Sequence, residues 1–253
     1  NEQQYYTNRS DNAYVSGGAL HIRAKKESYG GMNYTSARLN TNGKFTFTYG
    51  YVEARIALPA SQGIWPAFWM LGSVGWPSCG EIDIMEAINA ESKTYGTCHW
   101  NCNGHAEYGK SSGNFDRTQY HTYGLQWDNQ YIRMFVDGNK IYEMYIENNA
   151  GDTDEFHKPF YLLLNVAVGG NLTSNQLPAT SALPATMEVD YVRAYQRTSD
   201  NGTNSAKWTE QNQVPTYQIT MKDGKKTVSN VNAYDGETLD LPVLSKKRYT
   251  FNG

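Results

Sequence analysis

The sequence lacks a surplus of charge of either sign, a long apolar run and a large set of cysteines. Its 253 residues carry 22 Lys and Arg against 25 Asp and Glu, a net charge of −3, which leaves no basic excess to attract nucleic acid. The most apolar stretch, 160–164, is interrupted by Asn165 and is far shorter than the ~18–20 residues of a membrane span. We therefore expect no membrane span and no signal peptide.

Three cysteines without a CxxC pair argue against a zinc site or a disulfide framework and allow at most one bridge. Several catalytic and nucleotide-binding motifs are missing as well. The sequence has no Gly-x-Ser-x-Gly elbow, no His-Glu-x-x-His and no glycine-rich phosphate loop. These absences argue against a serine hydrolase, a zinc protease and a dinucleotide-binding enzyme.

Aromatic residues are abundant, at 13% of the chain, and short runs alternate between apolar and polar residues. Gly, Asn, Asp and Pro separate the runs, and no long window has a helical stripe. The predicted strands are 19–25, 44–57, 81–88, 94–101, 121–127, 132–136, 140–146 and 186–196. Many short strands with little helix predict an all-β fold, a β-sandwich of the jelly-roll form, with a small β appendage.

The composition changes after residue 197. Residues 198–214 are rich in Ser, Asn, Gly and Gln and predict a polar linker. Residues 215–253 alternate again and predict a small separate β unit. We therefore expect a main domain at 1–197, a linker at 198–214 and an appendage at 215–253.

Three carboxylates crowd into residues 81–86, which read E-I-D-I-M-E. Carboxylates this close raise the pKa of at least one of them. A solvated acidic edge is the alternative, but the intervening Ile82, Ile84 and Met85 belong to a strand packed on one side. The segment therefore predicts a chemical role for its acidic residues.

The spacing of these carboxylates predicts an irregular strand. Glu81 and Asp83 share one face of a regular strand, whereas Glu86 would point to the other face. A β-bulge near Ile84 or Met85 returns Glu86 to the first face. The two Glu side chains can then lean together to the ~5–5.5 Å of a retaining glycosidase pair, whereas an inverting pair needs a wider gap.

The strands 81–88 and 94–101 predict a hairpin in which Asn89 pairs with Thr94. The resulting cross-strand pairs are Asp83 with His99, Glu81 with Asn101 and Glu86 with Thr97. His99 and Asn101 should then project from the carboxylate face. The alternative is that His99 lies inside the sandwich, with its ring nitrogens hydrogen-bonded there.

The same register places Cys79 near Cys102. We therefore expect these two cysteines within reach of a bridge at the rim of the carboxylate face, and Cys98 packed inside the sandwich.

Tryptophans close to the carboxylate strand could stack against sugar rings. Trp65 and Trp69 fit the sandwich core equally well, because their alternation suits either place. Trp76 lies in a Gly- and Pro-containing loop, which favours contact with substrate, whereas Trp127 reads as core. The expected substrate-binding residues are Trp65, Trp69, Trp76, His99, Asn101, Asn1 and Arg38.

E-I-D-I-M-E resembles the signature of glycoside hydrolase family 16, in the bulged form of laminarinase-like members. The resemblance extends through the main domain. The matching motifs are N-E-Q-Q-Y-Y-T at 1–7, G-Y-V-E-A-R at 50–55, G-I-W-P-A-F-W-M-L-G at 63–72, G-W-P-S-C-G at 75–80, H-T-Y-G-L-Q-W at 121–127 and V-D-Y-V-R at 189–193. It implies a concanavalin A-like jelly roll in which Glu81 is the nucleophile, Glu86 the acid/base and Asp83 the partner hydrogen-bonded to Glu81.

The resemblance also implies an endo-β-1,3-glucanase that retains configuration, with mixed-linkage β-1,3-1,4-glucan as a second expected substrate. Met85 favours the laminarinase side, because enzymes restricted to mixed-linkage glucan lack this extra residue. The alternatives are a lichenase and a non-catalytic β-glucan-binding lectin, although lectins of this fold have lost the carboxylates. Agarases and carrageenases share the bulge, but the chain lacks the basic surplus expected for them.

Two further expectations follow from resemblances. We expect the family's first strand to be absent here, since the sequence opens in mid-pattern. Members that have this strand often hold a structural calcium, and the resemblance implies Asp190 as the residue that would bind it here. Residues 215–253 resemble the start of a bacterial surface repeat of the Listeria–Bacteroides type. We expect a secreted or surface-attached bacterial monomer that binds β-glucan polysaccharide, with no nucleic-acid partner and no cofactor needed for catalysis.

Overall fold

A computed structural model describes residues 2–197 and, beyond them, strands at 208–210, 216–223, 226–234, 245–246 and 249–250. Asn1, one of the expected substrate-binding residues, lies outside the described residues. The chain divides into two compact units, Asn1–Gln211 and Asn212–Gly253. Each unit is described by itself.

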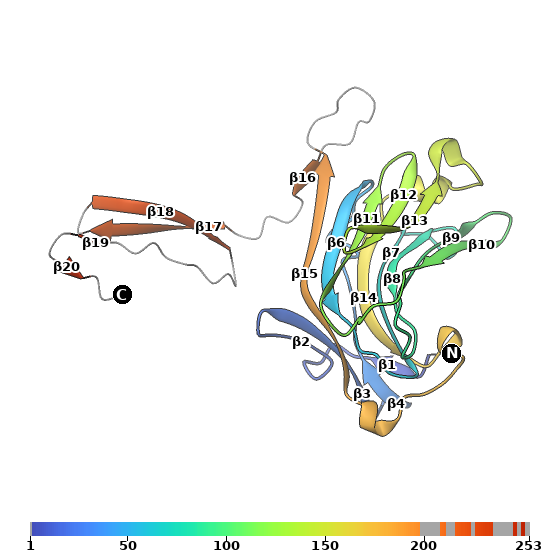
Figure 1. Cartoon of the computed structure of the whole chain (residues 1–253). Helices are drawn as coiled ribbons and strands as arrows, with labels where there is room; N and C mark the ends of the chain where they lie inside the picture. The colour runs from blue at the N-terminus through green and yellow to red at the C-terminus, as the bar shows by residue number, and fades with distance from the viewer. Residues whose placement is uncertain are drawn as a thin grey trace. The chain divides into compact units, whose positions relative to one another are not determined.

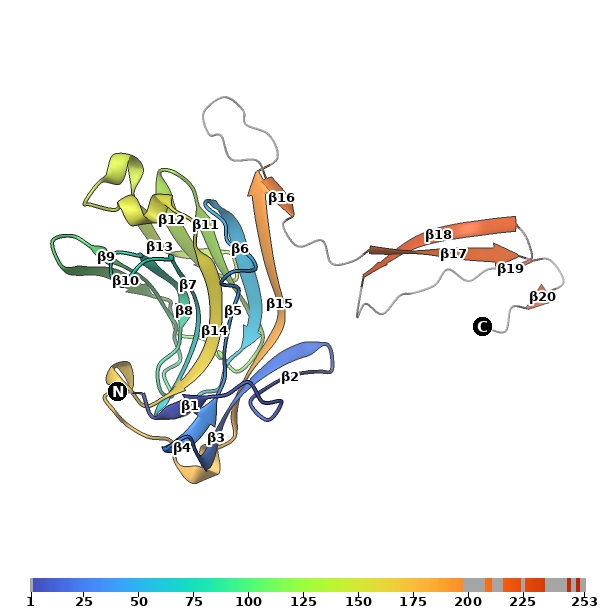
Figure 2. The same cartoon turned by 180° about the vertical axis from the view of Figure 1, so that it is seen from behind.

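Two antiparallel-rich sheets form the first unit (Figures 1 and 2). The larger sheet has the order β1-β4-β3-β15-β6-β11-β12-β13, with β2 pairing with β3 and β16 with β15. Its strands are β1 (Gln4–Tyr6), β2 (Ala13–Ser16), β3 (Ala19–Tyr29), β4 (Met32–Ser36), β6 (Gly50–Ala57), β11 (His121–Trp127), β12 (Tyr131–Val136), β13 (Asn139–Tyr145), β15 (Ala185–Arg197) and β16 (Trp208–Glu210).

The smaller sheet has the order β10-β9-β8-β7-β14-β5. Its strands are β5 (Arg38–Asn40), β7 (Ile64–Leu71), β8 (Glu81–Glu86), β9 (Tyr95–Asn101), β10 (His105–Ser111) and β14 (Tyr161–Val168). Short 3-10 turns occur at η1 (Glu147–Asn149), η2 (Asp154–His157), η3 (Asn171–Thr173) and η4 (Thr180–Ala182).

Alternating side chains from both sheets meet in one apolar core. On β6, Val52, Ala54 and Ile56 are buried, and on β7 Phe68 and Met70 are buried. This alternation follows from the two-residue period of a strand, which turns every second side chain inward. The predicted all-β sandwich is confirmed, and Trp127 is a fully buried core residue as predicted.

The strands agree with the prediction wherever alternation was clear, and the strand at 121–127 has the predicted limits. The region 44–57 forms a strand only over Gly50–Ala57. Other strands had not been predicted. They are β1, β2, β4, β5, β7, β10, β14 and β16.

The second unit contains a hairpin of β17 (Thr216–Asp223) and β18 (Lys226–Tyr234) and a short pair of β19 (Ser245–Lys246) and β20 (Tyr249–Thr250). Within the predicted linker, β16 pairs with β15 through Glu210 opposite Tyr195 and Trp208 opposite Arg197. The boundaries predicted at 197/198 and 214/215 stay predictions.

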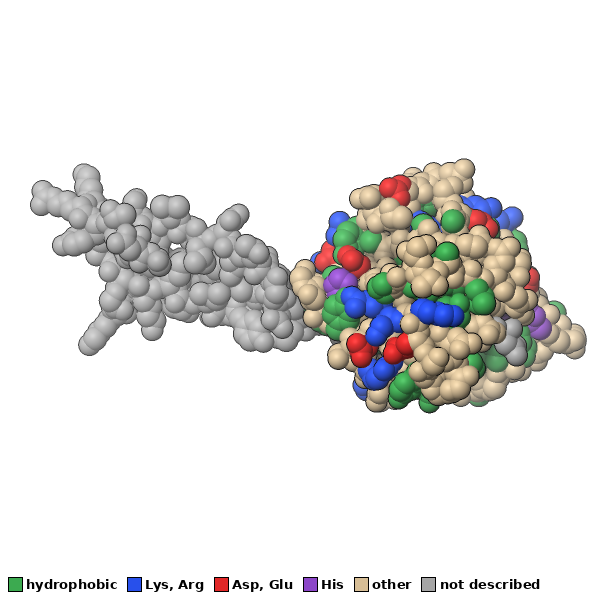
Figure 3. All heavy atoms as spheres, turned by 90° about the horizontal axis from the view of Figure 1, so that it is seen from below, with side chains coloured by type: hydrophobic (Ala, Val, Ile, Leu, Met, Phe, Trp, Pro, Cys, Tyr) green, Lys and Arg blue, Asp and Glu red, His purple; other side chains and the backbone are tan. Residues whose placement is uncertain are grey.

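Charges of both signs are interspersed at the end of the first unit where β3 and β4 lie (Figure 3). Arg9 Nη2 lies 2.6 Å from Glu27 Oε1, and Lys25 Nζ lies 3.6 Å from the same oxygen. Such mixing accords with the small net charge of the sequence. In the part of the chain that the structure describes, no helix has the length and hydrophobicity needed to cross a membrane.

Candidate active site

The strand β8 carries its three carboxylates on the face that points away from the core. Ile82, Ile84 and Met85 are all core residues. The ladder with β7 pairs Phe68 with Met85 but Trp69 with Asp83, so Ile84 has no partner in that ladder. The ladder with β9 also shifts between Asp83 and Glu86. This irregularity lies where the spacing of the acidic residues predicts an extra residue.

A cleft of about 110 Å³ lies over the middle of the smaller sheet. It is lined by side chains of β5, β7, β8 and β14 together with one residue preceding β1. The lining residues are Glu2, Arg38, Trp65, Ala67, Trp69, Glu81, Asp83, Glu86, Asn165 and Ala167. The cleft therefore brings together all three carboxylates with two of the predicted tryptophans and Arg38.

Burial dominates the electrostatics of this acidic cluster. Asp83 is 3% exposed and Glu86 is 6% exposed. Burial raises the pKa of Glu86 to about 7, the hydrogen bond from Trp65 acts in the lowering direction, and the charge of Glu81 adds to the rise. Burial also raises the pKa of Asp83 well above its usual range, helped by the charges of Glu86 and Glu81 and by a hydrogen bond with Glu81. Both shifts favour the protonated form relative to an exposed carboxyl group.

Three indole N–H groups hold the polar side chains of the cleft. Trp65 Nε1 donates to Glu86 Oε1 at 2.9 Å. Trp76 Nε1 donates to Glu81 Oε2 at 2.6 Å. Trp69 Nε1 donates to Asn165 Oδ1 at 2.7 Å. Trp65 and Trp69 therefore line the cleft, and their contact with substrate stays a prediction.

Glu2, just before β1, lines the cleft, a contribution that the sequence did not reveal. Arg38 lies over the rings of Tyr6 and Trp69, with centroid distances of 4.6 and 5.3 Å. Its Nη2 is 3.6 Å from Glu2 Oε1. Asn165 Nδ2 donates to the Tyr6 hydroxyl at 3.1 Å. These polar groups supply hydrogen-bonding partners at the cleft wall.

The predicted hairpin register is wrong by two residues. Glu81 lies opposite His99, Asp83 opposite Thr97, and Glu86 opposite Tyr95. The cause is the longer connection after β8. Asn89 N–H donates to the Ile64 carbonyl at 3.0 Å, and Thr94 N–H donates to Ser112 Oγ at 2.9 Å, so Asn89 and Thr94 bond to other segments.

A shift of two residues keeps side chains on the same face of a strand. His99 Nε2 consequently still lies 3.3 Å from Asp83 Oδ2. Burial lowers the pKa of His99, which favours the neutral imidazole. Asn101 is displaced, however. It is exposed, and its Oδ1 accepts the backbone N–H of Gly104 at 3.0 Å, so it caps the turn between β9 and β10 rather than lining the cleft.

The proposed bridge between Cys79 and Cys102 is also wrong, since all three cysteines are free thiols. Cys79 is buried, whereas Cys102 is exposed and its thiol donates to Asp152 Oδ2 at 3.3 Å. The bridge had been inferred from the register that the structure corrects. Cys98 is fully buried, as predicted.

Asp190 does not fit a calcium site. Its Oδ2 accepts a hydrogen bond from Arg55 Nη1 at 2.7 Å, and a guanidinium in that place opposes a cation. Calcium takes six to eight oxygen ligands. Among the described residues, the groups of His and acidic side chains close enough to share an ion do not include Asp190.

A jelly-roll sandwich whose cleft is lined by buried carboxylates and tryptophans is the architecture of a polysaccharide-degrading domain. Residues 1–193 match the model of glycosyl hydrolases family 16, and the chain belongs to that family.

Relatives and a solved structure agree with this assignment. The chain is 41% identical to the clotting factor G alpha subunit of Tachypleus tridentatus over 79% of this chain, but spans only 30% of that protein. It is 41% identical to a beta-glucanase of Rhodothermus marinus, over 77% of this chain and 74% of the relative. The crystal structure of the laminarinase from Rhodothermus marinus superposes with a TM-score of 0.70 at 39% identity, covering 83% of this chain and 86% of that one.

Proposed function

We propose that the first unit is a retaining endo-β-1,3-glucanase of the laminarinase type. The observation that carries the proposal is the placement of Glu81 and Glu86 in one cleft, with Asp83 between them, and with the pKa of Glu86 raised to about 7. A glycosidase needs one carboxyl that keeps a proton near neutral pH and one carboxylate that can attack.

In the first step, Glu86 donates its proton to the glycosidic oxygen while the carboxylate of Glu81 attacks the anomeric carbon. The C–O bond to the leaving sugar breaks as the bond to Glu81 forms. Trp76 donates to one oxygen of Glu81, and Asp83 hydrogen-bonds with the same side chain. Both contacts orient Glu81 for attack.

In the second step, ionised Glu86 takes a proton from water, whose oxygen attacks the anomeric carbon and releases Glu81. Two inversions restore the β configuration. Carboxyl groups and water suffice for both steps, so we propose a reaction without a cofactor.

The aromatic rings favour a polysaccharide substrate. Trp65 and Trp69 line the cleft and Trp76, 54% exposed, stands beside Glu81, so their rings can stack against sugar faces. Arg38 and His99 offer donors to hydroxyl groups. The similarity to a beta-glucanase and a laminarinase supports β-glucan. We place laminarin before mixed-linkage glucan because the motif contains the extra residue Met85, and β8 is irregular beside it, at Ile84.

A non-catalytic β-glucan-binding lectin is the rival from another class. It would have no use for a buried acid whose pKa lies near 7. Product analysis on laminarin, lichenan, agarose and xyloglucan in parallel tests activity and specificity together. We expect oligosaccharides from laminarin. Proton NMR should show that their new reducing ends are first released as the β-anomer. An α-anomer would overturn the retaining mechanism, and binding without products would favour the lectin.

For the remainder of the chain we propose a polar linker at 198–214 and a partial surface β-repeat at 215–253, on a secreted or surface-attached bacterial monomer. The described hairpin of β17 and β18 is compatible with a small β module. Sedimentation of the full chain tests the monomer, and fractionation of the producing cells tests the location.

A further inference from the structure

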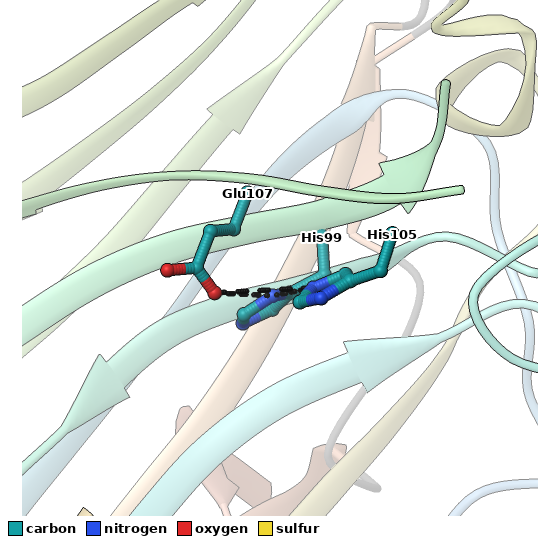
Figure 4. Close-up of side chains that lie close together, drawn as sticks. All are labelled: His99, His105 and Glu107. Carbon is teal, nitrogen blue, oxygen red and sulfur yellow. Dashed lines mark hydrogen bonds and ion pairs between the residues drawn. The ribbon is translucent and has the colours of Figure 1, made fainter. Parts of the chain in front are cut away.

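Beside the carboxylates, the hairpin of β9 and β10 places three metal-ligating side chains together (Figure 4). Glu107 lies directly opposite His99 in the ladder, and His105 precedes Glu107 by two residues, so both point to the same face. His99 is half-buried, while His105 and Glu107 are exposed.

The separations of the ligand atoms lie on either side of those in a tetrahedral metal site. His99 Nδ1 is 2.9 Å from His105 Nε2 and 3.5 Å from Glu107 Oε2, and His105 Nε2 is 3.9 Å from that oxygen. Tetrahedral zinc with bonds of about 2.0–2.2 Å sets its ligand atoms roughly 3.4 Å apart. We propose that His99, His105 and Glu107 bind a Zn²⁺ ion at the rim of the cleft.

The surroundings of His99 support this site. When Nδ1 binds the metal, Nε2 carries the proton and faces Asp83 Oδ2 at 3.3 Å. A carboxylate that accepts from the far nitrogen of a ligating histidine would fix the tautomer and orientation of that histidine. Asp83 Oδ2 has no hydrogen-bond partner among the described residues and lies in place for that role. The Trp76 ring lies 4.6 Å from the His105 ring, centroid to centroid, and shields one side of the cluster. Three protein ligands leave the fourth position to water.

A second grouping must be distinguished from this one. Glu81, Asp83 and His99 also lie close enough to share an ion, which would use the other nitrogen of His99. The proposed site instead combines two imidazoles with one carboxylate, the donor set that suits Zn²⁺. The two groupings share His99. His105 and Glu107 belong only to the proposed site, whereas Glu81 belongs only to the second grouping, so variants of these residues distinguish the two.

Titration of the full chain with ZnCl₂ by isothermal calorimetry tests the proposal without reference to catalysis. We expect one Zn²⁺ per molecule. Loss of a residue that only hydrogen-bonds to a metal ligand costs about 10–100-fold in metal affinity. His105→Ala and Glu107→Gln remove proposed ligands themselves, so each should weaken Zn²⁺ binding by at least that much. The Glu81→Gln variant should bind Zn²⁺ with the same affinity as the unchanged protein. Co²⁺ in place of Zn²⁺ should give the intense visible bands of a tetrahedral site, lost in His105→Ala.

Several results would overturn the site. They are the absence of binding to the unchanged chain, binding that His105→Ala and Glu107→Gln leave intact, and binding that only Glu81→Gln removes. Circular dichroism melting of each variant verifies its fold. Because both substituted side chains are exposed at a hairpin, we expect unchanged melting curves. The binding result does not depend on whether the chain hydrolyses laminarin.

Discussion

Trp65 donates its indole N–H to Oε1 of Glu86 at 2.9 Å, so the side chain proposed as the acid is bonded to a residue of the neighbouring strand. A hydrogen bond to a carboxylate favours its charged form and lowers its pKa. Burial acts more strongly in the opposite direction and raises the pKa of Glu86 to about 7. Trp65 therefore limits how far burial can raise that pKa.

This balance predicts a pH profile. Glu86 must be protonated to act as the acid, so kcat/KM on laminarin should fall as pH rises through about 7. Trp65→Phe removes the N–H donor, raises the pKa of Glu86 and should move the alkaline limb upward by about one pH unit. The measurement is kcat/KM against pH for both proteins.

Trp69→Phe is the matched control, because Trp69 donates to Asn165 rather than to a catalytic carboxyl. In this variant, the alkaline fall of kcat/KM should occur at the same pH as in the unchanged enzyme. A shift of the limb toward lower pH in Trp65→Phe, or equal shifts in both variants, would contradict the assignment of Glu86.

Substitution of the proposed nucleophile and acid should remove nearly all turnover. Glu81→Gln and Glu86→Gln each delete a group that takes part in bond breaking, so kcat on laminarin should fall by several orders of magnitude. Glu143→Gln, whose carboxylate pairs with Arg133 and Lys140 on the other sheet, should leave kcat near its original value.

Azide separates the two roles. In Glu81→Ala it can enter the space of the missing carboxylate and attack the anomeric carbon, which gives an α-glycosyl azide. Recovery of activity with that product supports Glu81 as nucleophile. A β-glycosyl azide from this variant would reverse the proposed roles.

The free thiols predict a simple chemical result. Cys102 is exposed, whereas Cys79 and Cys98 are buried. A thiol reagent should therefore label Cys102 in the folded protein and all three cysteines in denaturant, and reductant should not change the melting temperature. Cys98→Ser places a hydroxyl in the core and should lower the free energy of unfolding by about 1–3 kcal/mol, whereas Cys102→Ser should be nearly neutral. A melting temperature that falls with reductant would reveal a disulfide.

Alternation predicted the strands that bury one face, such as β6 and β11, because the core selects every second residue. It could not predict β10, whose residues are exposed except for the half-buried Ala106. An edge strand without a buried face carries no alternating signal. The proposed zinc ligands His105 and Glu107 were therefore missed.

The carboxylate strand was predictable because its acidic residues conflict with a purely structural role. Its partners were harder to predict, because pairing depends on loops far away in sequence. Asn89 bonds to Ile64 at the start of the neighbouring strand β7, and this contact sets the hairpin two residues from the simplest register. Glu2 and Asn165 reach the cleft only through the sheet order, which places β14 beside β7 and the start of the chain beside β14.

The appendage should be dispensable for hydrolysis of soluble laminarin. The cleft lies on the smaller sheet, while β16 pairs with the end of β15 on the larger one. Truncation after Gln211 keeps β16, and truncation after Arg197 removes it. We expect both truncated proteins to retain nearly full kcat and KM, and the shorter one to melt at a slightly lower temperature because it loses the pairing with Tyr195 and Arg197. If either truncated protein folds by circular dichroism but loses activity, residues beyond the truncation complete the catalytic domain.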